Sequence, residues 1–594
     1  MKKFTAVFMA FALSFGILVG CSGDDRADAL SGSGVQDSDL QASDEQTSDG
    51  QFSGYDYTDV FTMDSREWGS YDRLIDEIRA TADLTRREAL MHQAEDMLMN
   101  TGVVLPICYY NDIYMQKDYV SNLYSNLSGC KYFLFAETDG DTLRLNLGGE
   151  PDGLDPALAS SVDGMSLAVN SFAGLYTYDS RGNVVPDLVA DEQVSGDGLT
   201  YTITLLPDLK WSDGSELKAE DFIYAWNRVI DPATDSDCGY LFDIVARNED
   251  GFLKAEAGAE GDVQTLTIEL TAPCAYFNEL LASPAFFPIK QSEVEDEPDW
   301  RSNPGAWAQE AGFVTNGAYT LDAWIHDESL TYVKNPNYHR ADDVGIETLQ
   351  FMLSDDDAAA YAAYKAGSLD FIDNVPEEEI RDLLDNDELK IVDQQGTYYT
   401  VFHVDSPLFE GKTAAQADAM RRAFALLVDR GYICQYIMQA GQKPANTLVP
   451  AGMADGHGGV FKTNDSDYVF PDEADEGYFN PVWSQATVEE AIALLEYAGY
   501  RFENGKLSPE TPISFEYLTN NASGHIAVAE ALQQDFAEIG IEMTINSMEQ
   551  KAFLRERKAG NYDMARGCRF ADFNDPVNML EIWTTDSDGG DCGL

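Results

Sequence analysis

The chain has 594 residues, of which 38 are lysine or arginine and 104 are aspartate or glutamate, so its formal net charge is −66 at pH 7. A surface this acidic repels the phosphates of nucleic acids and of anionic membranes, which excludes nucleic-acid binding. The length suffices for two or more folding units, and a hydrophobic content of 44% is ordinary for a globular protein.

The first residues have the pattern of an export signal. Two lysines precede an apolar run at 4–19, which is shorter than the roughly 20 residues that a membrane-spanning helix needs. The run ends in a Leu-Val-Gly-Cys sequence at Cys21 that resembles a bacterial lipobox. Residues 1–21 are therefore interpreted as a lipoprotein signal peptide, with Cys21 as the lipidated end of the mature chain. Such a lipid would hold the protein at the outer face of the cell membrane without spanning it.

Residues 22–54 are rich in Ser, Gly, Asp and Gln and almost free of large apolar side chains. They cannot bury enough apolar surface to fold, so a flexible acidic linker is predicted. Setting Cys21 aside, the other seven cysteines are scattered without a CxxC pair, which argues against a disulfide framework or a zinc knuckle. One bridge stays open among Cys108, Cys130, Cys238, Cys274, Cys434, Cys568 and Cys592.

Globular patterning begins at Tyr55. Apolar residues at helical spacing in 71–100, with a break around Asp83, predict two helices, and the apolar stretch 103–110 predicts a strand. Strands and helices then alternate to the end, for example at 199–205 (strand), 219–228 (helix) and 488–497 (helix). This alternation is typical of α/β lobes.

From Asp141 onward, short motifs follow one another in a characteristic order. They are Glu150-Pro151-x-x-Leu154-Asp155-Pro156, Leu209-Lys-Trp211-Ser-Asp213-Gly214, Asp221-Phe-x-Tyr-x-Trp226-x-Arg228, Asn316-Gly317-x-Tyr319, Lys334-Asn335-Pro336-x-Tyr338, Lys365-x-Gly367-x-x-Asp370, Arg421-Arg422-Ala423, Asp429-Arg430 and Ala571-Asp572-Phe-Asn-Asp-Pro576. Each is weak alone. In this order they resemble extracellular solute-binding protein family 5, the oligopeptide-, dipeptide- and nickel-binding proteins of ABC importers.

The resemblance implies an α/β, two-lobed, periplasmic-binding-protein-like (type II) fold with a central inter-lobe cleft. Two crossover strands of the family match positions near 109–110 and 397–400. One lobe would then comprise residues 109–400, including the crossovers, and the other residues 55–108 together with 401–594.

The segments stand in an unusual order. The family continues beyond the Ala-Asp-Phe-Asn-Asp-Pro motif, whereas this sequence ends soon after it, and residues 55–108 resemble the family's C-terminal segment. The chain thus resembles a circular permutant whose old ends are joined near 138–141, in a polar loop where such joins are tolerated. An assembly or gene-calling error is the rival explanation. The signal peptide and linker directly before the moved segment argue for a translated arrangement.

The resemblance also implies how a ligand is held. Binding a peptide as an added strand satisfies its backbone, and two family segments that do so match Ser160-Ser161-Val162 and Cys568-Arg569-Phe570. Asp572 matches the acidic residue that receives the peptide ammonium, a charge that is costly to bury unpaired. The alternative for Asp572 is a cap of the turn that follows it.

Other matches leave two interpretations open. Arg557 and Arg566 match arginines that reach the ligand carboxylate, but ordinary salt bridges are equally consistent with them. Tyr110 and Tyr398 either line the pocket or belong to the core. The sequence departs from the family where Arg569 replaces a common aromatic residue and His403 a common asparagine, so the preferred ligand stays open.

The implied function is a monomeric substrate-binding lipoprotein, without cofactor or metal, that captures short peptides and delivers them to the transmembrane subunits of an ABC permease. A receptor for nickel, a metal chelate or another small solute is an alternative, although the six histidines show no paired ligand spacing. A peptide-signal receptor would use the same chemistry. An enzyme is not expected, since HExxH and GxSxG motifs do not occur, but inspection alone does not refute a paired-carboxylate glycosidase.

Overall fold

The computed structural model describes residues 68–151, 153–159, 161–465, 468–472, 476–585, 587 and 592–594. The predicted signal peptide, Cys21, the linker and Ser160 lie outside these residues. Across the described ranges, no helix has both the length and the apolar character needed to cross a membrane.

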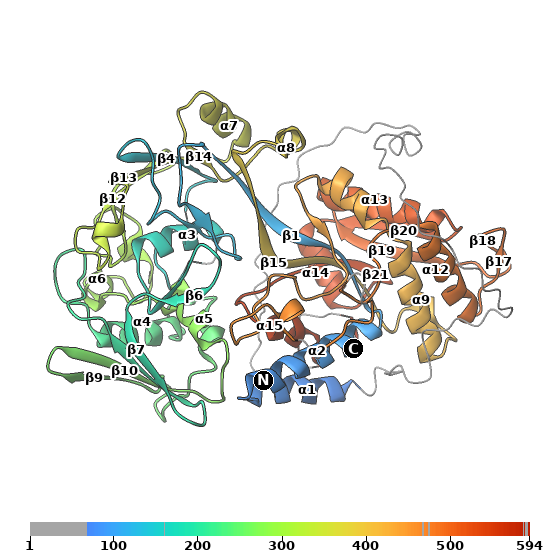
Figure 1. Ribbon diagram of the computed structural model, residues 1–594, viewed down its shortest axis with the longest axis horizontal. Coiled ribbons are helices and arrows are strands. Elements are labelled where there is room, and N and C mark those ends of the chain that lie inside the picture. Colours follow the sequence, from blue (N-terminus) through green and yellow to red (C-terminus); the bar gives the residue numbers. More distant parts are fainter. Residues whose placement is uncertain are drawn as a thin grey trace, which may run out of the picture.

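Two lobes lie side by side and are joined by two long strands, β1 (Val104–Gln116) and β15 (Leu389–Phe402) (Figure 1). The first lobe contains a sheet in the order β7-β8-β10-β9 and another in the order β11-β12-β13-β4. A mixed sheet in the order β14-β1-β15-β21-β19-β20, with β16 also paired to β1, begins at β14 in the first lobe and continues through the two long strands into the second lobe (Figure 1). The predicted two-lobed α/β architecture is confirmed.

The first lobe is formed by the middle of the chain. Its strands are β2 (Tyr124–Ser125), β3 (Lys131–Tyr132), β4 (Thr142–Leu147), β5 (Tyr176–Tyr178), β6 (Val184–Pro186), β7 (Val189–Val194), β8 (Thr200–Leu205), β9 (Ala255–Glu260), β10 (Val263–Glu269), β11 (Tyr319–Ile325), β12 (Ser329–Lys334), β13 (Thr348–Leu353) and β14 (Phe371–Ile372). Its helices are α3 (Val162–Ser171), α4 (Ala219–Val229), α5 (Phe277–Leu281), α6 (Gln291–Glu295), α7 (Asp357–Lys365) and α8 (Glu377–Leu383).

The second lobe combines elements from both ends of the chain. Its helices are α1 (Gly69–Ala80), α2 (Leu84–Asn100), α9 (Ala414–Leu427), α10 (Arg430–Tyr432), α11 (Phe461–Asn464), α12 (Gln485–Tyr497), α13 (Ser523–Ala537), α14 (Gln550–Lys558) and α15 (Pro576–Leu580). Its strands are β16 (Lys443–Pro444), β17 (Phe502–Glu503), β18 (Lys506–Leu507), β19 (Ser514–Asn520), β20 (Glu542–Met548) and β21 (Met564–Phe570). In Figure 1 the blue helices α1 and α2 lie beside α15.

Local signals explain several element boundaries. The side chain of Asp83 accepts a hydrogen bond from the backbone nitrogen of Arg86 and so caps α2, which produces the predicted break between the two front helices. Helix α12 begins three residues before the predicted helix, because Ser484 and Thr487 form a capping box. Strand β1 runs six residues beyond the predicted end at 110, because β15 pairs with it as far as Met115.

The front segment is tightly packed into the second lobe. The Trp68 indole donates to the carbonyl of Trp583 at 2.7 Å, and the Tyr71 hydroxyl to that of Leu580 at 2.8 Å. Arg87 on α2 makes a two-pronged salt bridge with Asp575 through distances of 2.7 and 2.8 Å, and these side chains are only 3% and 0% exposed. Residues separated by most of the chain thus share one core.

We expect Arg87→Ala to destabilise the second lobe by about 3–5 kcal/mol, because it leaves the Asp575 carboxylate buried without its cation. The neighbouring Arg86→Ala is the matched control: Arg86 pairs with Glu77 on the surface, where both side chains are 64% and 46% exposed, and its loss is expected to cost about 0–1 kcal/mol. Urea unfolding followed by tryptophan fluorescence measures both. Equal losses in the two variants would contradict the assignment.

Candidate functional site

Strand β21 has an open edge beside the crossover strand. On one side it pairs with β15 from Met564 to Phe570. On the other side β19 pairs with it only at Met564 and Ala565, and no further strand follows there among the described residues. The backbone of residues 566–570, which includes the predicted Cys568-Arg569-Phe570 segment, is therefore available to an added strand.

Asp572 lies two residues beyond the end of β21, close enough to the first lobe for its charge to act on Cys238 and Tyr240. Its side chain is 34% exposed and accepts hydrogen bonds from Arg569 at 2.9 Å and from the Asn578 amide at 3.3 Å. Burial raises the pKa of Cys238, a first-lobe thiol, to about 11, and the charges of Asp237 and Asp572 add to this. The turn cap that sequence alone leaves open for Asp572 is supplied instead by Asp575, whose carboxylate accepts from the backbone of Val577.

Arg569 holds Asp572 but has a second anchor. Its guanidinium donates to the side-chain oxygen of Asn578 at 2.7 Å and to the carbonyl of that residue at 3.2 Å. Asn578 in turn accepts from the backbone nitrogen of Asp572 at 2.8 Å. The loop after β21 is thus braced by α15, and Asn578 contacts both the backbone and the carboxylate of Asp572 independently of Arg569.

The two predicted arginines are both buried in the second lobe. Arg566 is 6% exposed, and among the described residues no carboxylate lies within 4 Å of its guanidinium. It contacts the Cys568 sulfur at 3.8 Å and lies 5.1 Å from the centre of the Phe553 ring. Arg557 is 2% exposed, and both arginines act electrostatically on Tyr517. The buried charge of Arg566, with no carboxylate within reach in the described part of the chain, favours an anionic guest.

Tyr110 and Tyr398 are core residues that also border Arg566. They are 6% and 0% exposed, and burial raises the pKa of both hydroxyls while the charge of Arg566 lowers it. The Tyr110 ring lies 4.4 Å from that of Phe570 and 6.2 Å from that of Tyr398. A Cβ on Gly396 would lie 2.7 Å from the Phe570 ring, so this packing requires glycine there.

His525 belongs to the same cluster, although its sequence surroundings gave no sign of it. Its Nδ1 lies 3.4 Å from the Tyr398 hydroxyl. Burial, assisted by the charge of Arg566, lowers the pKa of His525 to about 3, so the imidazole is neutral at physiological pH. A neutral imidazole beside a buried arginine offers a hydrogen bond without adding charge. By contrast, His403 packs against Tyr562 and is not part of this cluster.

The other predicted segment differs in part from expectation. Ser161 is extended, but its side chain accepts from the backbone nitrogen of Gly164, and Val162 is the first residue of α3. Val162 therefore begins a helix and does not extend the added-strand match, because the serine cap starts α3 there. The segment still lies near the crossover, since Val162 and Gln394 of β15 both border Gly129.

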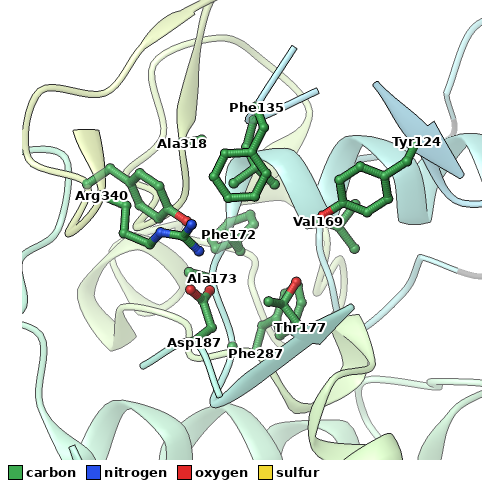
Figure 2. A pocket seen from close by; sticks show the side chains of 13 residues that line it. Tyr124, Phe135, Val169, Phe172, Ala173, Thr177, Asp187, Phe287, Ala318 and Arg340 are labelled. Atoms are coloured by element: carbon green, nitrogen blue, oxygen red, sulfur yellow. The ribbon is translucent and has the colours of Figure 1, made fainter. Parts of the chain in front are cut away.

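Two partly open pockets of the described residues lie elsewhere. One, of about 20 Å³, sits inside the first lobe among aromatic side chains and the Asp187 and Arg340 groups (Figure 2). It has room for a water molecule but not for a peptide. Another, of about 410 Å³, is lined by residues of α2, β1, α9 and α12 and by Pro471, Asp472, Tyr478, Phe479 and Asn480 of the second lobe. Neither is lined by Asp572 or Arg566.

Comparison with known proteins identifies the fold and the family. The family model for bacterial extracellular solute-binding proteins, family 5, matches residues 183–591. The chain belongs to this family. This is a family of solute-binding proteins, which confirms the expectation of a binding protein and not an enzyme.

Curated family 5 proteins align with about three quarters of the chain. The dipeptide-binding protein DppE of Bacillus subtilis is 29% identical over 459 residues, which are 76% of this chain and 78% of that protein. The periplasmic murein peptide-binding protein MppA of Escherichia coli is 28% identical, covering 74% and 77%. A probable deoxycholate-binding periplasmic protein of E. coli, YgiS, is 29% identical, covering 75% and 78%.

Solved family 5 structures share the two-lobed fold. The unliganded open form of MppA superimposes with a TM-score of 0.62 at 24% identity, covering 77% of this chain and 84% of that one. Haemophilus influenzae OppA in complex with the peptide RPPGFSPFR gives 0.52 at 26% identity, covering 77% and 85%. The predicted type II periplasmic-binding-protein fold is thereby confirmed.

Proposed function

We propose that this family 5 protein captures short peptides at the junction of its lobes for an ABC importer. The observation that carries the proposal is the open edge of β21. This strand carries the buried Arg566 and leads to Asp572, two residues beyond its end. Every peptide has a backbone, an ammonium group and a carboxylate group. The strand edge, the acid and the arginine on this stretch of chain offer a partner for each of them. DppE and MppA are named for peptide ligands, which supports this choice.

The peptide backbone would pair with residues 566–570 as an added strand. Main-chain hydrogen bonds make no demand on side-chain identity, so this mode suits a receptor for varied sequences. Ser161 and Val162 are proposed to contact the peptide from the first lobe. Closure of the lobes around the guest would then bury it and form the surface that the permease subunits bind.

The peptide ammonium is proposed to bind Asp572. Arg569 retains its two contacts with Asn578, so the carboxylate can accept the ammonium without leaving this arginine unsatisfied. Arg566, assisted by Arg557, is proposed to receive the peptide carboxylate. The buried guanidinium of Arg566 has no carboxylate partner among the described residues, and a guest carboxylate would supply one.

YgiS raises a second candidate, a steroid acid, because that relative is named as a probable deoxycholate-binding protein. Such a guest would use the arginines but offers no ammonium, so Asp572 would contribute nothing favourable to it. A nickel or metal-chelate receptor and a peptide-signal receptor are further alternatives. The first would not depend on peptide ends, and the second differs only in the downstream partner.

The test uses native mass spectrometry to find the length of co-purifying peptides, followed by calorimetric titration with an alanine peptide of that length. Free, N-acetylated and C-amidated forms are compared on the wild type, Asp572→Asn and Arg566→Gln. We expect Asp572→Asn to weaken the free peptide about 10- to 100-fold and to leave the acetylated form unchanged, because one charge-assisted hydrogen bond contributes about 1.5–3 kcal/mol. Arg566→Gln should weaken the free peptide by a similar factor and leave the C-amidated form, which lacks the carboxylate, unchanged.

The control for this test is Asp250→Asn, an exposed carboxylate in a first-lobe turn whose loss should not alter binding of any form. If Asp572→Asn weakens the free and acetylated peptides equally, Asp572 does not receive the ammonium. If deoxycholate binds and no peptide does, the peptide proposal is wrong.

We also propose that a lipid on Cys21 anchors the protein outside the cell membrane, with the 22–54 linker as its tether. A linker of this length spans roughly 30 Å on average, enough to let the lobes reach a permease. In cells, Cys21→Ser should move the protein from the membrane fraction to the medium or periplasm. Unchanged membrane association of this variant would contradict the anchor.

The permuted order is the remaining proposal. Trp68 and Trp583 are in contact, which supports an ancestral connection from the end of this chain to its front segment. A chain rearranged to run 141–594 and then 68–138 should fold and bind the same ligand, since it keeps the sequence of every helix and strand and changes only how the segments are connected. Failure of this rearranged chain to fold, judged by circular dichroism, would refute the permutation.

A further inference from the structure

Three metal-ligating side chains meet at the contact between the front segment and the rest of the second lobe. Glu88 lies on α2, and Asp455 and His457 lie in the loop between β16 and α11. One ligand atom from each lies within 4.8 Å of the other two. The dispersed histidines of the sequence gave no hint of this group, because 369 positions separate Glu88 from His457.

The distances suit a small divalent ion. Glu88 Oε2 lies 2.8 Å from His457 Nε2, and this nitrogen lies 3.7 Å from Asp455 Oδ2. In a tetrahedral zinc site with bonds of about 2.0 Å, ligand atoms lie about 3.3 Å apart. The observed separations fall on either side of that value, so small side-chain shifts suffice for all three to reach one ion.

One oxygen of the buried Glu88 carboxylate lacks a hydrogen-bond donor among the described residues. Its side chain is 3% exposed, and Oε1 is buried with no hydrogen-bond partner among the described residues. The neighbouring Arg87 is already paired with Asp575, so it does not neutralise Glu88. Two buried carboxylates therefore share a single imidazole, which favours an added positive charge.

The loop holds its two ligands in place. Asp455 Oδ1 accepts from the backbone nitrogens of His457 at 2.7 Å and Gly459 at 2.9 Å, and the Asn464 amide donates to Oδ2. A Cβ on Gly459 would lie 2.5 Å from Asp455 Oδ2, so this close approach requires glycine. Such outer contacts orient metal ligands before the ion binds.

From this geometry we propose that Glu88, Asp455 and His457 bind a divalent transition metal, with Zn²⁺ as the natural probe, and that the ion fastens α2 to the loop. One imidazole and two carboxylates suit Zn²⁺ or a neighbouring first-row ion, with water completing the coordination. His457 is partly exposed, at 24% of its side chain, which provides an entry path. The site shares no residue with the proposed peptide site, and its ion is structural, not cargo.

The test is calorimetric titration of Zn²⁺ into the full-length, untagged protein after chelator treatment, with a parallel thermal unfolding scan. We expect one saturable site per chain, a rise in melting temperature with Zn²⁺, and much weaker binding of Ca²⁺, which prefers oxygen ligands. His457→Ala and Glu88→Gln should each weaken Zn²⁺ at least tenfold.

The matched control is His326→Ala. His326 also stands between two carboxylates, but Glu150 lies at its Nδ1 and Glu310 at its Nε2, so one ion cannot join all three, and Zn²⁺ binding should not change. Circular dichroism and peptide binding verify that each variant is folded. If the His457→Ala protein does not fold, the result for Glu88→Gln, which preserves the shape of the side chain, decides whether the metal site exists. Absence of saturable Zn²⁺ binding, equal binding of Ca²⁺, or unchanged affinity in a folded Glu88→Gln protein would overturn the proposal.

Discussion

The antiparallel pairing of β1 with β15 is the interaction on which both lobes and the site depend. It runs from Val104 opposite Val401 to Met115 opposite Leu389, so one two-stranded ribbon carries the chain across the lobe junction in both directions. Because β15 also pairs with β21, the ribbon positions the strand that carries Arg566 and leads to Asp572. Between Asn111 and Tyr114 no third strand pairs with this ribbon among the described residues, and two strands alone twist more easily than a wider sheet, which suits a hinge.

The candidate site combines an acid that has hydrogen-bond partners, Asp572, with a buried base that has no carboxylate partner among the described residues, Arg566. Asp572 is held by Arg569 and Asn578 before any guest arrives, so its orientation is prepared at little cost. Arg566 is buried among Tyr110, Tyr398 and Tyr517, and burial of its charge is unfavourable until an anion reaches it. In the proposed function, a guest carboxylate would pair with Arg566 and offset this cost, so the filled state would be favoured over the empty one. This difference between empty and filled states can drive closure.

Local patterns made some features predictable from sequence and left others beyond reach. The break at Asp83 and the helix starting at 219 follow from caps and apolar spacing within a few residues, and the ordered motifs indicated the family and Asp572. The start of α3 at Val162 was missed, because one serine hydrogen bond decides it. His525 and the group around Glu88 were missed for another reason. Their partners lie more than a hundred positions away, and no local pattern records such contacts.

The two lobes differ in how the chain completes them. The first lobe is formed by one continuous stretch between β1 and β15, whereas the second needs α1 and α2 from the front as well as everything after β15. Contacts such as Trp68 with Trp583 span 515 positions, so the second lobe gains its full core only when both ends are present. Closing such long loops costs chain entropy, which buried pairs such as Arg87 with Asp575 must offset. We infer that the first lobe folds before the second, and that proteins interrupted during refolding would show amide protection in β8 and β10 before it appears in α2. Simultaneous protection of these elements in pulse-labelling hydrogen exchange would contradict this order.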